Sequence, residues 1–133
     1  MAKKTKMLIV DDEEGIITFL KEFFEARNFE VFQAQNSKQA IKEVAESAPD
    51  IILLDINLGK GPTGIDVLKD IKNIDKKAGV IMMTGVKDEE VTKEALKLGA
   101  LDYITKPLSL SYLDKVVVLK LLNLQFRNMS KGE

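Results

Sequence analysis

Five short apolar runs alternate along the chain with longer segments in which apolar residues recur every three or four positions. The runs are Met7–Val10, Val31–Ala34, Ile51–Leu54, Val80–Met83 and Leu101–Ile104. A short, continuous apolar run indicates a strand that is covered on both faces. The second and fifth runs carry polar residues such as Gln33 and Asp102, so we expect these two strands at the edges of the sheet.

The segments that follow the runs predict helices. Ile16, Leu20 and Phe24 repeat at helical spacing in the first, and Ala40, Val44 and Ala48 in the second. Asn36 followed by Gln39 resembles a capping box, and Gly99 is placed to end the fourth helix. Five strands alternating with five helices predict an α/β fold with a mostly parallel sheet and helices on both faces.

Composition narrows the chemistry that this chain can carry out. The chain has 133 residues, which we expect to form a single domain over 1–133 with an ordered core of about 6–126. It has no cysteine and no histidine, which excludes disulfides, thiol catalysis, imidazole zinc sites and Ser-His-Asp triads. A net charge of −1 gives no footprint for nucleic acid. We recognise neither a signal peptide nor a membrane span, and expect a cytoplasmic protein.

Polar residues follow four of the five predicted strands. Asp11 and Asp12 come after the first, Asp55 after the third and Thr84 after the fourth, and Lys106 lies just beyond the fifth. Parallel strands end at the same edge of a sheet, which is where ligands bind in open α/β folds. Each residue alone has an ordinary reading as a turn former, a helix cap or a solvated charge. Their joint placement favours a shared site.

Three clustered carboxylates repel one another, and the single charge of Lys106 does not balance them. An all-oxygen ligand set without histidine or cysteine favours Mg²⁺, with Mn²⁺ or Ca²⁺ as alternatives. Mg²⁺ often takes one or two carboxylates together with phosphate oxygens. The sequence therefore predicts a Mg²⁺ site that also holds a phosphoryl group.

These motifs resemble the response-regulator receiver domain of two-component signalling, in its single-domain, chemotaxis-regulator-like form. The resemblance rests on Asp11-Asp12, Asp55, Met83-Thr84-Gly85 and Lys106-Pro107, and on the run Gly99–Tyr103. It covers about residues 6–126. It implies a flavodoxin-like, doubly wound fold with five parallel strands in the order 2-1-3-4-5.

The resemblance also implies residue roles. Asp55 corresponds to the phosphoacceptor, which takes its phosphoryl group from a sensor histidine kinase or a histidine phosphotransfer protein. Asp12 and Asp55 would bind Mg²⁺ (Mn²⁺ is possible) with the backbone carbonyl of Asn57, while Asp11 would act through water. Lys106 would pair with the phosphoryl oxygens.

The same resemblance implies a switch. Thr84 would donate a hydrogen bond to the phosphoryl group, Gly85 would leave room beside it, and Tyr103 would move between exposed and inward rotamers. The Lys106–Pro107 bond corresponds to a cis peptide. Asn57 and Val86 occupy positions that modulate phosphate lifetime, and the apolar Val86 predicts a moderately long-lived phosphate. The loop at 56–64 is longer than usual in the family.

The last helix carries two apolar stripes. Leu113, Val117, Leu121 and Leu124 form the first, and Val118, Leu119, Leu122 and Phe126 form the second. A surface helix needs one stripe, so the second predicts a contact surface for a homodimer, a target or an output domain. The alternative is a helix more buried than a surface helix.

Other functions stay open at this stage. The chain is expected to be a signalling phosphoacceptor rather than an enzyme, either standing alone or as the N-terminal receiver of a longer, for example DNA-binding, regulator. A Mg²⁺-dependent phosphohydrolase with an aspartate nucleophile would need an acid where Asn57 stands. A flavin carrier would need a phosphate-binding loop where Asp11 to Glu14 are all acidic. A receiver that docks without phosphorylation is a fourth possibility.

Overall fold

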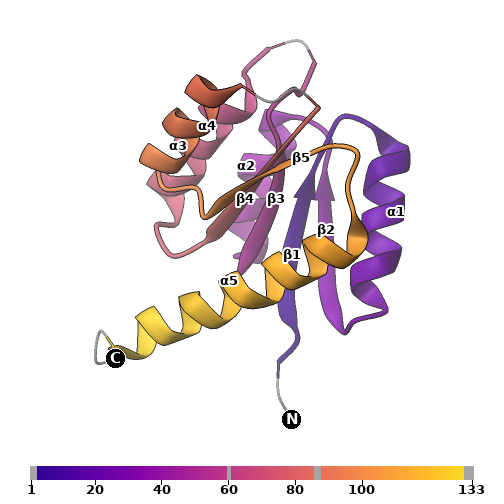
Figure 1. Ribbon diagram of the computed structural model, residues 1–133, viewed down its shortest axis with the longest axis vertical. Helices are drawn as coiled ribbons and strands as arrows, with labels where there is room; N and C mark the ends of the chain where they lie inside the picture. Colours follow the sequence, from indigo (N-terminus) through magenta and orange to yellow (C-terminus); the bar gives the residue numbers. More distant parts are fainter. Residues whose placement is uncertain (1–2, 60, 86–87, 131–133) are drawn as a thin grey trace.

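The computed structural model describes residues 3–59, 61–85 and 88–130, with side chains up to residue 126 of the last helix. Within these residues five strands alternate with five helices (Figure 1). The strands are β1 (Thr5–Val10), β2 (Phe29–Ala34), β3 (Ile51–Asp55), β4 (Gly79–Thr84) and β5 (Asp102–Thr105). The helices are α1 (Glu14–Glu25), α2 (Ser37–Ser47), α3 (Gly64–Ile74), α4 (Glu89–Lys97) and α5 (Leu110–Ser130).

The strands form one parallel sheet in the order β2-β1-β3-β4-β5, which confirms the predicted fold class and strand order. β3 and β4 are buried along their whole length, whereas β2 and β5 have exposed positions. The prediction that the two mixed runs are edge strands is confirmed. Each edge strand has a neighbouring strand on one side only, and polar side chains are tolerated there.

Several strands are longer than their apolar runs. Asp55 and Thr84 belong to the last positions of β3 and β4 rather than following them, and Asp55 pairs in register with Met83. The ladder depends on backbone groups, so a polar side chain at the carboxyl end does not stop the pairing. Both side chains are therefore held by the sheet itself.

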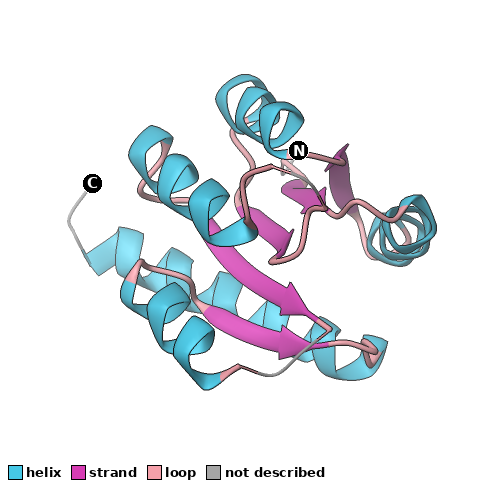
Figure 2. Cartoon of the chain, turned by 90° about the horizontal axis from the view of Figure 1, so that it is seen from above, coloured by secondary structure: helices cyan, strands magenta, loops and turns pink. Residues whose placement is uncertain are grey.

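Helices cover both faces of the sheet (Figure 2). One core layer contains α2, α3 and α4, with Ala40, Leu68 and Ala95 buried against the sheet. The other contains α1 and α5, with Leu20 and Leu113 buried. At the edge where the strands end, the loops from both layers meet.

The helix-end signals that the sequence predicted are confirmed in part. The Asn36 side chain accepts a hydrogen bond from the Gln39 N–H at 2.9 Å, as in a capping box. The Gln39 side chain, however, accepts from the N–H of Gln35 and not from that of Asn36, so the second bond of a capping box does not form. Gly99 ends α4 with a φ of 104°. α5 continues to Ser130, past the end we expected for the ordered core. No helix in the described ranges has the length and apolar character needed to cross a bilayer.

Candidate functional site

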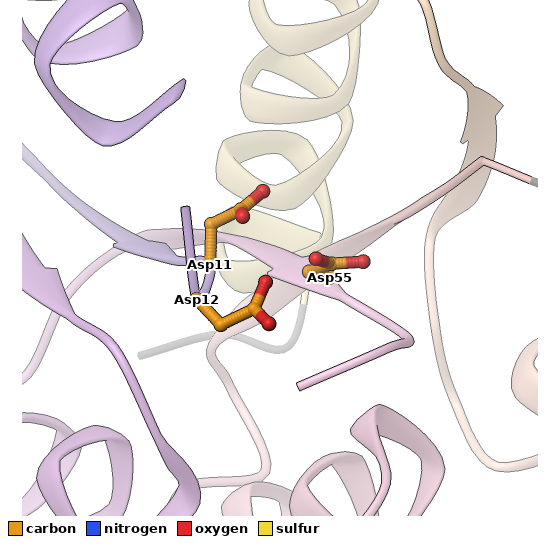
Figure 3. Close-up of side chains that lie close together, drawn as sticks. All are labelled: Asp11, Asp12 and Asp55. Carbon is orange, nitrogen blue, oxygen red and sulfur yellow. The ribbon is translucent and has the colours of Figure 1, made fainter. Parts of the chain in front are cut away.

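Three carboxylates gather at the carboxyl edge of the sheet (Figure 3). Asp11 and Asp12 follow β1, and Asp55 ends the neighbouring strand β3. One ligand oxygen from each lies within 4.8 Å of the others. From β1 the chain crosses to β2 on one side, and from β3 to β4 on the other, so the cluster lies at the topological switch point of the sheet.

Local turns orient two of these carboxylates. Asp11 Oδ1 accepts from the Glu13 N–H at 2.9 Å, and Asp55 Oδ1 accepts from the Asn57 N–H at 3.1 Å. Such turns, in which an aspartate bonds the backbone two residues on, bend the chain away from the strand. Asp11 is fully buried and Asp55 is 3% exposed, so these bonds fix both groups in a largely dry position. The second oxygen of each is left for other partners.

Lys106 supplies the positive charge between them. Its Nζ lies 2.8 Å from Asp11 Oδ2 and 3.3 Å from Asp55 Oδ2. Its own N–H donates to the Thr84 carbonyl at 2.6 Å, which ties the end of β5 to the end of β4. The bond to Pro107 is cis, as predicted. Burial lowers the pKa of Lys106. The hydrogen bond to Asp11 and the negative charges of Asp55 and Asp11 together have a larger effect in the other direction, so the pKa of Lys106 is raised.

The pKa of Asp55 is also raised, which for a carboxyl group disfavours the charged form. Burial is the main cause, and the negative charge of Asp11 adds to it. The Asn57 N–H and the Lys106 ammonium oppose this shift without cancelling it, so the pKa of Asp55 is raised to about 6. The free energy of this site therefore favours any additional positive charge beside Asp55.

The residues present fit a hard divalent cation. Asp12 is exposed and faces the same crevice as the two buried carboxylates, and the donor set is all oxygen. Mg²⁺ and Mn²⁺ prefer such ligands. The acidic cluster predicted at Asp11, Asp12 and Asp55 is thus present, and one ammonium leaves it short of neutrality.

Thr84 and Tyr103 lie on the β4–β5 side of the site. Thr84 is 6% exposed at the end of β4, and the Ile56 N–H donates to the carbonyl of Met83 beside it. Tyr103 is half-buried and packs against the core layer of α2, α3 and α4. A Cβ built on Gly85 would meet no atom within 4 Å. Val86 lies outside the described residues.

The loop after Asp55 depends on glycines that the sequence analysis did not single out. A Cβ on Gly64 would press on the carbonyl oxygen of Asp55 and lie 2.6 Å from the Cα of Ile56. The Gly64 N–H donates to the Ile56 carbonyl at 2.7 Å, so the start of α3 is drawn onto the end of β3. Gly59 has a φ of 77° and lies beside Asp12. Three of the nine residues at 56–64 are glycines, and this density was the sequence signal for a loop that depends on them.

The second apolar stripe of α5 is exposed and lies apart from the acidic site. Val118, Leu119 and Leu122 are 47%, 56% and 55% exposed, and Phe126 is 77% exposed. Leu113 and Val117 of the first stripe are fully buried. The alternative of a helix more buried than a surface helix is therefore wrong, and the four side chains form a surface.

Comparison with known proteins identifies the family. The sequence profile of the response regulator receiver domain matches residues 7–118. The chain is 41% identical over 102 residues to sporulation initiation phosphotransferase F of Bacillus subtilis, covering 77% of this chain and 82% of that protein. It is 35% identical to the regulatory protein AtoC of Escherichia coli, covering 88% of this chain but 25% of that protein.

A CheY-like receiver domain protein from Methanospirillum hungatei has a similar solved structure. The TM-score is 0.90 at 26% identity, over 94% of this chain and 99% of the other. The chain thus spans most of some relatives and about a quarter of others. The chain belongs to the receiver domain family of two-component response regulators, whose members are signalling phosphoacceptors.

Proposed function

We propose that this chain is a phosphorylation-activated switch in which Asp55 accepts a phosphoryl group. An Asp55 carboxylate oxygen attacks the phosphorus of a phosphohistidine; the new P–O bond forms as the P–N bond breaks, and the leaving imidazole nitrogen takes up a proton. The observation that carries the proposal is the pair of contacts from Lys106 to Asp11 and Asp55 at the buried end of β3. An ammonium already lies where the transferred oxygens would bring charge.

The carboxylate cluster supports a resident divalent cation. Asp12, Asp55 and the backbone carbonyl of Asn57 would hold Mg²⁺, or Mn²⁺ in its place, and Asp11 would act through water. When bound, the cation neutralises charge on the phosphoryl oxygens. Asp12 is the exposed member of the cluster, which leaves an open side for ligand exchange.

Thr84 and Tyr103 are the proposed switch residues. The Thr84 hydroxyl would donate to a phosphoryl oxygen, and Thr84 would move toward the phosphoryl group to do so. This movement would change the rotamer of Tyr103 and the face formed by α4, β5 and α5. Changing a population from about 1:99 to 99:1 takes roughly 5.5 kcal/mol. Charge-assisted hydrogen bonds from Lys106 and Thr84, at about 1.5–3 kcal/mol each, are of that size.

The phosphoryl group would leave by self-catalysed hydrolysis. A water attacks the phosphorus, the bond to the Asp55 oxygen breaks, and phosphate is released. Asn57 and Val86 are the proposed modulators of this rate. The Asn57 amide oxygen accepts from the Gly59 N–H at 3.3 Å, so its side chain is held within the loop. An amide does not transfer protons well as a general acid or base, which disfavours the phosphohydrolase alternative.

The partners follow from this chemistry. The phosphodonor would be a sensor histidine kinase or a histidine phosphotransfer protein, and the recipient of the signal a target protein or an output domain. Val118, Leu119, Leu122 and Phe126 offer one contact surface, including for a homodimer through α5. We place the protein in the cytoplasm, without direct binding to nucleic acid. A receiver from a longer regulator would use the same site.

Acetyl phosphate with Mg²⁺, followed by intact mass spectrometry, tests the proposal. We expect one phosphoryl adduct on the wild type and none after chelation of the metal. Asp55→Asn should abolish the adduct, and Asp70→Asn, on the exposed side of α3, should leave it unchanged. Absence of an adduct on the wild type, or its survival in Asp55→Asn, would overturn the assignment of Asp55.

A further inference from the structure

The exposed face of α5 has the spacing of a coiled-coil seam. Tyr112, Lys115, Leu119, Leu122 and Phe126 follow one another at alternating intervals of three and four residues. Repetition of this kind is what allows two helices to keep one face in contact along their length. The seam faces away from Leu113 and Val117, which are buried against the sheet, so the domain's own core does not obstruct it.

The positions beside the seam carry no charge. Ser111, Val118, Asn123 and Gln125 flank it, and Val118 is 47% exposed and extends the apolar surface. Charged residues at flanking positions set the choice and the orientation of the partner helix through interhelical salt bridges or repulsion. An uncharged flank places no like charges together when two identical helices meet.

The exposed area is sufficient for a pair. Tyr112, Leu119 and Leu122 are each slightly more than half exposed, and Phe126 is 77% exposed. With Val118 these side chains present roughly 600 Å² on one copy and about 1,200 Å² on two, which reaches the lower end of specific interfaces. A second copy of this chain would cover the whole seam at once.

Lys115 decides the orientation of the two helices. In a parallel pair, Lys115 would face its own counterpart inside the seam, which places two ammonium groups together. In an antiparallel pair with the two-fold axis midway between Leu119 and Leu122, Leu119 faces Leu122 of the second copy. Lys115 and Phe126 lie four residues further from that axis on either side, so they face each other.

We infer that α5 pairs with α5 of a second copy in an antiparallel arrangement. Each Lys115 then lays its aliphatic stem along the seam and its ammonium over the ring of Phe126 of the second copy, which is a favourable cation–π contact. The axis falls at the middle of Leu110–Ser130, so the two helices overlap along their full length. The inference rests on the contact surface proposed above and is independent of the chemistry at Asp55.

Sedimentation equilibrium tests the pairing. We expect a mass of two chains for the wild type and one chain for Leu119→Glu. Leu96→Glu, a matched control at a 47% exposed leucine on α4, should remain a dimer. Circular dichroism should show that all three proteins are folded, as expected for changes at exposed positions. A wild type that stays monomeric across a wide concentration range would overturn the inference, as would dissociation by Leu96→Glu.

Disulfide formation tests the orientation, because the chain has no native cysteine. Lys115→Cys and Phe126→Cys proteins are mixed and oxidised. An antiparallel pair gives the mixed disulfide, since two copies of either position lie about 16 Å apart along the helices and a disulfide requires Cα atoms within about 7 Å. Disulfides only between identical variants would show a parallel pair and overturn the inference.

The acetyl phosphate assay on the same samples separates the two proposals. Leu119→Glu should form the phosphoryl adduct as the wild type does. A monomeric wild type that is phosphorylated would overturn only the pairing. A dimer that forms no adduct would overturn only the role of Asp55.

Discussion

The ammonium of Lys106 lies closer to Asp11 than to Asp55, with Nζ 2.8 Å from Asp11 Oδ2 and 3.3 Å from Asp55 Oδ2. The two residues Lys106 and Asp11 are 95 positions apart in the sequence. Because Asp11 is fully buried, this contact compensates a charge that water does not reach. It also holds Lys106 beside Asp55 before any phosphoryl group is present.

Lys106→Met should lower the free energy of unfolding by about 2 kcal/mol at pH 7, because it leaves buried carboxylates without their partner. The loss should be smaller at pH 4, where Asp55 is protonated in the folded protein. Urea unfolding at both pH values measures the difference. Lys93→Met, at an exposed lysine of α4, is the control and should change little. An equal loss for Lys106→Met at both pH values would contradict the prediction.

The raised pKa of Asp55 should make folding weaker as the pH rises. Its pKa is about 6 in the folded protein against 3.8 for an ordinary aspartate, so between these values the folded state holds the proton more tightly than the unfolded state. The free energy of unfolding therefore falls across pH 4 to 6, by about 3 kcal/mol in total from this group. It stays low above pH 6.

Asp55→Asn isolates this contribution. The amide does not titrate, so the variant should lose less stability than the wild type between pH 4 and 7 and be the more stable protein at pH 7. Denaturant titrations of both proteins without metal, across this range, provide the comparison. Parallel pH profiles for the two proteins would show that Asp55 has an ordinary pKa.

Mg²⁺ should stabilise the fold through the carboxylate cluster. A ligand that binds only the folded state adds about 2.7 kcal/mol at a concentration one hundred times its Kd, and each further tenfold adds about 1.4 kcal/mol. The thermal midpoint should rise with Mg²⁺ and fall again on adding EDTA. Asp12→Asn should reduce this rise strongly, while Asp70→Asn should keep it. A rise of the same size in Asp12→Asn would place the cation elsewhere.

Gly64→Ala should destabilise the protein by about 2–3 kcal/mol, because the added methyl meets backbone atoms of Asp55 and Ile56 that have no room to move. Gly85→Ala is a matched control, since a Cβ there meets nothing within 4 Å. Chemical denaturation of both variants gives the two values. If Gly64→Ala were as stable as Gly85→Ala, the close approach of α3 to the end of β3 would not constrain the site.

Much of the fold could be predicted because burial restricts which residue types occur at each position along the chain. Ile51–Leu54 and Val80–Met83 are apolar at every position, and only strands covered on both faces require that. The edge strands could be recognised for the complementary reason, since Gln33 and Asp102 are tolerated where one side faces solvent. The exposure of Leu119 and Phe126 was predicted by helical spacing, which distinguishes two faces of α5 without any tertiary information.

Other features depend on contacts between distant segments. The Gln39 side chain bonds the Gln35 N–H instead of completing a capping box, and Gly64 is required by the backbone of β3. The pKa of Asp55 is set by the depth of burial and by Asp11, which comes from another strand. None of these has a periodic signal along the chain.

By itself, the sequence determined the alternation of strands and helices and the placement of Asp11, Asp12, Asp55, Thr84 and Lys106 at strand ends. It could do so because side-chain polarity must match burial at each position of a strand. Only the tertiary structure decided that Lys106 bonds Asp11 more closely than Asp55, and that Asp55 resists ionisation. Coulomb energies and desolvation depend on distances through space, and those are set when the parallel strands come together.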